Sequence, residues 1–540
     1  MKKHIFPIIL IILVGALLIS SIFHSGWYTS HDGVYHILRT EEALRMLKLG
    51  QFPLRWAGTL DQGFGIPLFN FVYPLPYYFS AVFSYFVGAV WAVKSVIIIS
   101  YLLGGLGIYF LFSHKSRFTG IAFALIYLMT PYQFLNVFVR GALGEIMAMG
   151  LMPWVLLSFN SLVAKKSTFK WYHPLPMTLL LLAHNFLGII FAVFLVGYAL
   201  FQKENKRQIF ISILYSFGLA TFFLFPMIME RNNLYSLDRQ FFTFRFDQHF
   251  VYVKQLLYSK WDYWYSVPGD SDGMSFQLGF AQIVLSGLGI LAIIFNQKRS
   301  LSNLYLILAY FGSILLMTSR SFILWDKIAI LQTVQFPWRL LFMTAILSPL
   351  LGFIFILRLK SRHLRIIFLC GVLALSFWNI RNYRRPMKQF TESEYTDLYL
   401  LNLGKTTTTF RTEILPKWSV PDERYKSEEI LVNSGNMTID SLTFDPLKID
   451  LTINNKPDQN IGKLTILRNY YPGWIAIVDG KTRLELKPTD EGMIALEPQL
   501  GIHSYTVKMS STTTEKIANF ISLASLIGLG IIWRKNNQKN

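Results

Sequence analysis

The first long polar stretch of the chain holds an acid, two histidines and an arginine at spacings that could do chemistry. It reads WYTSHDGVYHILRTEEALRMLKLGQFPLRW and directly follows the first apolar block. If a helix begins near Asp32, then Asp32, His36 and Arg39 stand at positions i, i+4 and i+7 and share one face. Such a face could deprotonate a hydroxyl while Arg39 holds a phosphate. Asp32 could instead serve only as the helix cap. His31 and His36 near an acid are also a weak signal for a divalent metal.

Two further polar sites lie between or within apolar blocks. The segment LNVFVRGALGE places Arg140 and Glu145 at the ends of two such blocks. Arg140 could bind a phosphate. The simpler interpretation is that Arg140 pairs with Glu145 or extends to the membrane interface. His184 and Asn185 interrupt a long apolar stretch, where polar residues usually face a cavity or a protein partner. The alternative is that these two side chains only make hydrogen bonds to the backbone of the local helix turn.

Aromatic residues accompany two other candidate segments. The segment LQTVQFPWRLLF puts Gln335, Trp338 and Arg339 just before an apolar block. Arg339 could be a second phosphate ligand, while simple anchoring at the membrane interface by the aromatic residue explains the segment equally well. Near the C-terminus, RNYYPGWIAIVDGK gathers aromatic residues around a turn. They could stack on a carbohydrate, but we expect them to form a core or an interface.

The elements that must position these residues are apolar blocks long enough to cross about 30 Å of hydrocarbon as helices. They predict about twelve crossings, near residues 4–23, 92–112, 118–134, 146–164, 174–184, 186–201, 208–229, 277–296, 303–320, 338–357, 365–381 and 514–533. The block at 72–88 is expected to lie on the external membrane surface, because a crossing there would put Lys115 and Arg117 outside. The short blocks on either side of His184 are marginal as spans. We therefore expect that turn to dip into the external half of the membrane.

The charge of the chain follows its topology. The formal net charge of +20 over 540 residues could suggest nucleic acid. The basic residues, however, flank apolar blocks at short connections and chain ends, as cytoplasmic loops do. They include Lys2, Lys3, Lys115, Arg117, Lys165, Lys166, Lys170, Lys203, Lys206, Arg207, Lys298, Arg299, Arg358, Lys360, Arg362, Arg365, Arg534, Lys535 and Lys539. The longer polar regions, about 24–67, 230–276 and 382–512, are nearly balanced in charge. We therefore expect both chain ends in the cytoplasm, the longer polar regions outside, and no nucleic-acid partner.

Three parts of the chain are expected. Residues 1–381 form a polytopic transmembrane domain, with juxtamembrane helices in a first external loop at 24–91. Alternating stretches such as SLTFDPLKIDLTIN and IHSYTVKMS predict an external, sandwich-like β-rich domain over 382–512. Its VDGK segment suits a hairpin turn, because Asp-Gly tolerates the positive φ angles required. Residues 513–540 give a last transmembrane helix and a basic tail.

Two local features limit other interpretations. The opening MKKHIFPIILIILVGALLISSIF shows no small-x-small cleavage site, so we expect it to remain as the first membrane helix. The single cysteine, Cys370, lies in an apolar block. A disulfide framework and a cysteine-based zinc site are therefore excluded.

At these residues the chain resembles the GT-C superfamily of polytopic membrane glycosyltransferases. It is most similar to the YfhO-like and 6-pyruvoyl-tetrahydropterin synthase-related membrane proteins. The resemblance covers nearly the whole chain and rests on HDGVYH, GQFPLRW, GFGIPLFNFVYPLPYYF, RGALGE, AHN, QFPWR and YYPGWIAIVDG. Nothing in the chain resembles the soluble zinc-binding pterin synthase.

The resemblance implies transfer of a sugar, with inversion, from a polyprenyl-phosphate donor to an envelope glycan, lipid or protein at the external face of the plasma membrane. It makes Asp32 the general base, while Arg140 and Arg339 stabilise the departing phosphate. Many members of the superfamily carry paired acids in this loop, whereas Asp32 lies between His31 and Gly33. That departure leaves the identity of the base and any metal dependence open.

A non-catalytic membrane protein is the competing interpretation, either a transporter of a lipid-linked glycan or an envelope assembly scaffold. A transporter would carry inverted repeats and polar residues near the bilayer midplane, whereas these candidates cluster at helix ends. One observation distinguishes an enzyme from a scaffold. The enzyme hypothesis requires Asp32, Arg140, His184 and Arg339 to converge on one cavity.

Overall fold

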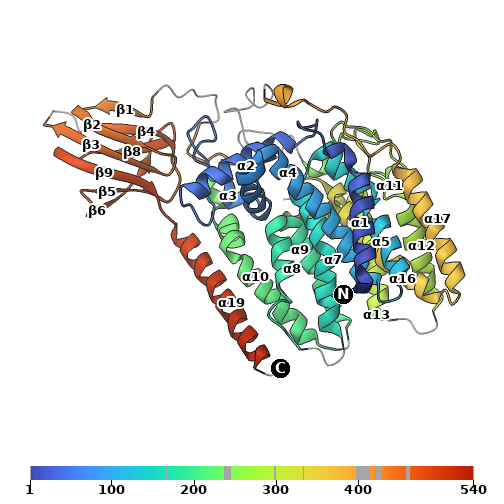
Figure 1. Cartoon of the computed structure of the whole chain (residues 1–540). Coiled ribbons are helices and arrows are strands. Elements are labelled where there is room, and N and C mark those ends of the chain that lie inside the picture. The colour runs from blue at the N-terminus through green and yellow to red at the C-terminus, as the bar shows by residue number, and fades with distance from the viewer. Residues whose placement is uncertain are drawn as a thin grey trace.

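A computed structural model of the protein describes residues 2–164, 168–202, 204–235, 245–296, 300–332, 334–396, 414–420, 428–457 and 462–538. It consists of a helical bundle with two β-sheets at one end, and helix α19 descends from the sheets beside the bundle (Figure 1). Of the basic residues expected in cytoplasmic loops, Lys165, Lys166, Lys203, Lys298, Arg299 and Lys539 lie outside the described residues.

The helices of the bundle follow the apolar blocks of the sequence. The first half contains α1 (Ile5–Leu18), α2 (Gly33–Lys48), α3 (Leu68–Phe71), α4 (Leu75–Phe112), α5 (Arg117–Leu128), α6 (Pro131–Phe134), α7 (Leu143–Val163), α8 (Leu175–Ala183), α9 (Asn185–Leu200) and α10 (Lys206–Met229). The second half contains α11 (Val253–Leu257), α12 (Phe280–Ile294), α13 (Leu301–Met317), α14 (Phe322–Lys327), α15 (Ala329–Gln332), α16 (Leu341–Arg358) and α17 (Arg362–Ile380). Helix α19 (Thr513–Asn537) follows the sheets. The segment between α1 and α4, which carries α2 and α3, is called the first loop below.

Length and apolar composition make several helices candidates to cross a membrane. Within the described ranges six qualify singly: α4, α7, α10, α16 with the preceding turn, α17 and α19. The number rises to eight if each of two bent helix pairs counts as one span. Three shorter apolar helices, α1, α9 and α12, lie among them. The chain is thus a polytopic helical membrane protein.

Sharp breaks divide several apolar blocks. Helix α4 is interrupted at Gly88, whose φ of 77° and ψ of 161° favour glycine. The break separates residues 72–88, which were expected at the membrane surface, from residues 92–112, which were expected to cross the membrane. At Leu135–Arg140 the chain forms a π-helical segment, a feature frequent at functional sites. The bent pair Leu301–Met317 and Ser319–Lys327 turns by 94°, so the crossing expected at 303–320 ends at Met317.

The chain ends and one basic turn, at residues 113–117, lie toward the same end of the bundle. Both termini lie toward the end that points away from the β-sheets (Figure 1). Arg117 donates to the carbonyl oxygen of Lys3 at 3.3 Å, and the ring of His114 lies 5.3 Å from that of Phe353 near the end of α16. The basic turn at residues 113–117 therefore lies beside the basic N-terminal segment.

The two sheets pack face to face as a sandwich, called the β-domain below. One sheet has the order β1-β4-β8-β7 and the other β2-β3-β9-β5-β6. The strands are β1 (Ile430–Ser434), β2 (Asn436–Phe444), β3 (Lys448–Lys456), β4 (Lys463–Asn469), β5 (Trp474–Val478), β6 (Thr482–Glu485), β7 (Lys487–Pro488), β8 (Met493–Leu496) and β9 (Gly501–Met509). Alternate residues of β3 are buried in a core shared by both sheets. Within the described residues the first strand begins at Ile430, inside the region 382–512 that was expected to be β-rich.

The expected hairpin turn in the β-domain is confirmed. Strands β5 and β6 pair with Val478 opposite Thr482, and three residues, Asp479, Gly480 and Lys481, connect them, one more than a two-residue turn has. Asp479 and Gly480 have positive φ values of 49° and 68°. The nearby Tyr471 and Trp474 are both 2% exposed and belong to the core. A surface patch for stacking on carbohydrate is therefore not present at these two residues.

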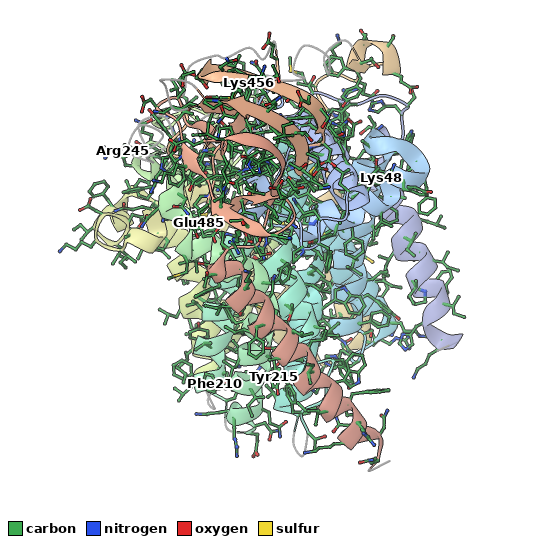
Figure 2. All side chains as sticks on the ribbon, turned by 90° about the vertical axis from the view of Figure 1, so that its left-hand side faces the viewer. Lys48, Phe210, Tyr215, Arg245, Lys456 and Glu485 are labelled. Carbon is green, nitrogen blue, oxygen red and sulfur yellow. The ribbon has the colours of Figure 1, made fainter. Side chains whose placement is uncertain are left out.

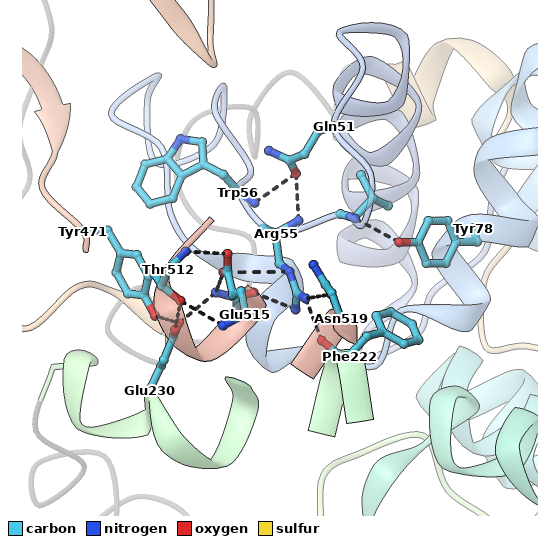
Figure 3. Close-up of polar contacts among 12 residues, drawn as sticks. Gln51, Arg55, Trp56, Tyr78, Phe222, Glu230, Tyr471, Thr512, Glu515 and Asn519 are labelled. Atoms are coloured by element: carbon cyan, nitrogen blue, oxygen red, sulfur yellow. Dashed lines mark hydrogen bonds and ion pairs between the residues drawn. The ribbon is translucent and has the colours of Figure 1, made fainter. Parts of the chain in front are cut away.

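The first loop joins the β-domain to the bundle. Trp56 packs in the β-domain core, with its ring 5.8 Å from that of Trp474. Next to it, Arg55 donates to the carbonyl oxygen of Phe222 on α10 and to Asn519 on α19 (Figure 3). Seen from the side of the sheets, α19 runs beneath the β-domain past Tyr215 of α10 (Figure 2). There is therefore one junction at which the first loop and the β-domain meet α10 and α19.

Candidate active site

Helix α2 begins where the sequence predicts, with Asp32 at its N-cap position. The Asp32 side chain makes no capping hydrogen bond, so capping does not account for this acid. Asp32, His36 and Arg39 all line one cavity, as their i, i+4, i+7 spacing predicts. The Asp32 carboxylate therefore faces a space that a ligand can enter.

This cavity, called the site cavity below, has a volume of about 230 Å³ and is built from segments far apart in the chain. Its walls are His31, Asp32, Tyr35, His36, Arg39, Tyr73, Arg140, His249, Tyr265, Ser266, Met274, Gln335, Phe336, Trp338 and Arg339. Four separate segments of the sequence thus supply one acid, basic side chains and aromatic rings to one space. Of the four residues that the enzyme hypothesis requires to converge, Asp32, Arg140 and Arg339 line this cavity, whereas His184 does not.

The loop that carries Asp32 is fixed by backbone contacts on two sides. The amide N–H groups of His31 and Asp32 donate to the carbonyl oxygens of Val139 and Arg140 at 3.0 and 2.9 Å. The close approach depends on Gly141, which has a φ of 64°. A Cβ atom there would lie 2.8 Å from Ser30 Oγ and 3.2 Å from the amide nitrogen of Gly33.

On the other side, the chain after α17 pairs with the residues just before Asp32. Thr29 donates to the carbonyl oxygen of Lys388 at 2.9 Å, and Phe390 donates to that of Trp27 at 2.7 Å. Tyr28 and Gln389 form an isolated antiparallel bridge between these bonds. Asp32 is thus held between the start of α7 and the segment that leads away from α17.

Behind the cavity wall, one buried acid pairs with two arginines. Glu145 accepts from Arg140 Nη2 at 2.8 Å and from the Tyr132 hydroxyl at 2.6 Å. Its Oε1 also lies 3.1 Å from Arg339 Nε, an ion-pair contact that lacks hydrogen-bond alignment. The pairing of Arg140 with Glu145 confirms the simpler interpretation of that segment. One carboxylate beside two guanidinium groups leaves a net positive charge of one facing the cavity.

Aromatic rings support the two arginines. The Arg140 guanidinium lies 4.8 Å from the ring centre of Trp338, and that of Arg339 lies 4.8 Å from the ring centre of Phe336. Trp338 is only 2% exposed and donates to Ser266 at 3.1 Å. The interfacial anchoring considered for this segment is therefore wrong for Trp338, because its ring is enclosed by protein.

His36 presents an unused hydrogen-bonding atom. Its Nδ1 lies 2.8 Å from the Tyr77 hydroxyl, which accepts from Arg39 Nη1 at 3.1 Å. Tyr77 then donates its proton to Nδ1, and the neutral ring carries its own proton on Nε2. Burial, followed by the charges of Arg39 and Arg140, holds the pKa of His36 well below its usual value. Nε2 is buried and has no partner within the described ranges, so it can donate to a ligand oxygen.

His31 lies between the acid and the cationic wall. Its ring stacks on Tyr265 at 4.3 Å. Burial lowers the pKa of His31 most strongly, Asp32 opposes this shift, and Arg140 adds to it. His31 is therefore a neutral wall residue at pH 7.

The remaining predicted residues lie farther from the cavity. His184 Nε2 is 4.0 Å from Glu145 Oε1, and its ring stacks on Tyr73 at 5.0 Å, so His184 supports the cavity wall from behind. His184 Nδ1 also accepts from the amide of Leu187 at the start of α9. Asn185 donates to Met227 Sδ at 3.0 Å and is not part of the cavity.

The segment 245–276 contributes residues that sequence reasoning missed. His249 and Tyr265 line the cavity, and His249 Nδ1 lies 3.0 Å from Ser266 Oγ. Burial and the charge of Arg339 lower the pKa of His249 to about 4, while Asp247 opposes the shift. No local spacing in this segment indicates a site. In the described part of the chain no group of three or more His, Cys, Asp or Glu residues is placed to hold a metal.

Fold and site together define a polytopic membrane protein with a polar, net cationic cavity beneath an appended β-domain. A family model described as 6-pyruvoyl-tetrahydropterin synthase related domain, membrane protein, matches residues 69–383. The chain belongs to this family of membrane proteins.

Two individual proteins are similar to this chain. An uncharacterized protein of Lactococcus lactis subsp. cremoris (strain MG1363) is 24% identical over 287 residues, which cover 49% of this chain and 46% of that protein. The chain thus spans about half the length of this relative. The cryo-EM structure of the arabinofuranosyltransferase AftD from Mycobacteria matches with a TM-score of 0.41 and 14% identity, over 75% of this chain and 27% of that one. A score this low does not establish a common fold.

Proposed function

We propose that this protein is a membrane glycosyltransferase that transfers a sugar from a polyprenyl-phosphate donor to an envelope acceptor, with inversion. The observation that carries the proposal is the placement of one carboxylate, Asp32, and two guanidinium groups, Arg140 and Arg339, on the walls of a single cavity of about 230 Å³. A transfer from a lipid phosphate needs these two kinds of group, a base for the acceptor and cations for the leaving phosphate.

In this mechanism each group has a distinct role. Asp32 takes the proton of the acceptor hydroxyl as its oxygen attacks the anomeric carbon. The bond between that carbon and the phosphate oxygen breaks, and the phosphate leaves with the electron pair. Arg140 and Arg339 stabilise the charge that develops on it, because Glu145 neutralises only one of the two cations. His36 donates from Nε2 to an oxygen of the bound substrate.

The proposal includes a topology. Both termini are cytoplasmic, the β-domain and the site cavity face the outside of the plasma membrane, and about twelve helices cross it. Two observations support this arrangement: the termini and the β-domain lie at opposite ends of the bundle (Figure 1), and the turn at residues 113–116 lies beside the N-terminus. A lipid-borne donor follows from it, since nucleotide sugars are made in the cytoplasm while the cavity faces outward.

Replacement of the base tests the mechanism. A strain that lacks the gene is complemented with wild type, with Asp32→Asn, or with Asp440→Asn, which removes an exposed carboxylate from β2. Lipid-linked glycans and cell-wall polymers are then compared. A positioned base typically contributes about 10²–10⁴ in rate, so Asp32→Asn should fail to restore the glycan pattern at unchanged protein level, whereas Asp440→Asn should restore it.

Two results would count against the proposal. Restoration by Asp32→Asn would remove Asp32 from the mechanism. A deletion strain with unaltered lipid-linked glycans and cell-wall polymers would contradict the glycosyltransferase assignment itself.

A further inference from the structure

A second cavity, separate from the site cavity, lies where the first loop, the β-domain and α19 meet. Its volume is about 300 Å³, and its lining shares no residue with the site cavity. The first loop contributes Phe52 and Arg55, the β-domain contributes Lys448 and Lys508, and Ser511 precedes α19. Neither the family match nor the proposed reaction gives this cavity a role.

Two lysines face each other directly at this cavity. Lys448 of β3 and Lys508 of β9 are cross-strand partners in the antiparallel ladder. Like charges in this position destabilise a strand pair. Lys448 Nζ contacts Asp450 Oδ2 at 2.6 Å, whereas Lys508 forms no ion pair among the described residues. The pair therefore carries excess positive charge that an anionic ligand would neutralise.

The other charged groups of the lining do not neutralise the lysines. Arg55 is engaged by Asn70, Asn519 and the carbonyl oxygen of Phe222, and its Nε lies 3.8 Å from Glu515 (Figure 3). Glu515 in turn accepts from Asn70 and from the amide of Thr512. Glu230, which is not part of the lining, accepts from Tyr471 and Asn70 and adds a second carboxylate beside Glu515. Among the lining residues themselves Arg55 and Glu515 balance each other, and the net positive charge of the lining comes from the lysine pair.

Apolar surface continues from this cavity. Leu49 and Phe52 belong to its lining and are 41% and 78% exposed. Helix α19 begins at Thr513, directly after the lining residues Ser510 and Ser511, and only 11% of its apolar window is buried. Because α19 is a candidate membrane span, the cavity lies at the level where lipid headgroups meet its first turns.

From these features we infer that the second cavity binds the headgroup of an anionic phospholipid of the surrounding bilayer. Lys448 and Lys508 hold the phosphate, and the acyl chains extend along the exposed surface of α19. Recognition requires an anion joined to an apolar tail, which distinguishes this ligand from a soluble phosphate. The inference does not depend on the reaction proposed for the site cavity.

The test measures lipid binding to the full-length protein in detergent. Phosphatidylglycerol and phosphatidylcholine are titrated and bound lipid is counted by native mass spectrometry. Wild type should bind phosphatidylglycerol more tightly than phosphatidylcholine. Lys448→Gln with Lys508→Gln should weaken phosphatidylglycerol binding about tenfold, because charge-assisted hydrogen bonds are lost.

A matched variant controls for overall charge. Lys481→Gln with Lys487→Gln removes the same charge from exposed positions of the β-domain outside the cavity and should bind phosphatidylglycerol as wild type does. Removing the opposed lysines should not lower the thermal unfolding midpoint. If the double variant unfolds early, Lys508→Gln alone retains the Lys448–Asp450 contact and should still weaken binding.

Three outcomes would overturn the inference. The first is equal binding of the two lipids by wild type. The second is equal loss of phosphatidylglycerol binding in the cavity variant and the control. The third is full competition by glycerol phosphate at the same concentration as the lipid, which would assign the cavity to a soluble phosphate.

Discussion

At the scale of single residues, Glu145 organises the cationic wall of the site cavity. It is 2% exposed and contacts Arg140, Arg339 and Tyr132. A buried carboxylate is tolerable only with such partners. The same contacts point the two guanidinium groups toward the cavity, so one residue determines both the position and the net charge of the wall.

Glu145→Gln should therefore destabilise the protein. Loss of the carboxylate leaves the buried Arg140 and the partly exposed Arg339 without their partner, and breaking a buried pair typically costs about 3–5 kcal/mol. The measurement is the thermal unfolding midpoint in detergent, with the exposed Glu392→Gln as control. Equal midpoints for the two variants would show that the arginines do not depend on Glu145.

At the scale of elements, close backbone contact between the first loop and the π-helical segment that precedes α7 positions the acid. Gly141 permits this contact through its positive φ and its missing side chain. The π-helical segment Leu135–Arg140 ends at this glycine and presents the carbonyl oxygens that hold His31 and Asp32. The site depends on this turn as much as on the acid itself.

Gly141→Ala should loosen the loop. A left-handed conformation costs a residue with a Cβ atom about 1–2 kcal/mol, and the new atom would lie within 2.8 Å of Ser30 Oγ. Hydrogen exchange should become faster at the amides of His31 and Asp32. Gly371→Ala on α17, where no atom lies within 4 Å of the added carbon, should leave it unchanged. Unchanged exchange in Gly141→Ala would refute the positioning role of this turn.

Local signals in the sequence predicted part of this architecture. The start of α2 at Asp32, the break at His184 and the Asp479–Gly480 turn each depend on a few neighbouring residues. The contributions of His249 and Tyr265 could not be predicted, because tertiary packing brings their segment to the first loop without any pattern of its own. Asn185 shows the opposite case, since this polar residue, next to His184 behind the cavity wall, points to Met227 on α10.

At the scale of the whole molecule, the first loop belongs to both the bundle and the β-domain. Its helix α2 contributes to the site cavity, while Trp56 lies 1% exposed in the core of the sandwich. The β-domain is therefore fixed to the part of the chain that carries the acid.

Trp56→Ala should destabilise the β-domain, because it removes an aromatic side chain from the core of that domain. Removal of a buried aromatic side chain typically costs about 3–5 kcal/mol. Limited proteolysis should cleave the β-domain of the variant faster than that of wild type. In the control variant Trp264→Ala, which changes a position that is 64% exposed, the β-domain should be cleaved at the wild-type rate. Identical cleavage of both variants would mean that the sandwich does not need Trp56.

The pairing of residues 388–390 with residues 27–29 has a mechanical consequence. A force that pulls on the chain leaving α17 acts on the backbone three and five residues before Asp32, through the hydrogen bonds of Thr29 with Lys388 and of Phe390 with Trp27. Tension on that segment would shift the carboxylate relative to the two arginines, which are held separately by Glu145 on α7. The alignment of acid and cations can therefore respond to mechanical load applied outside the bundle.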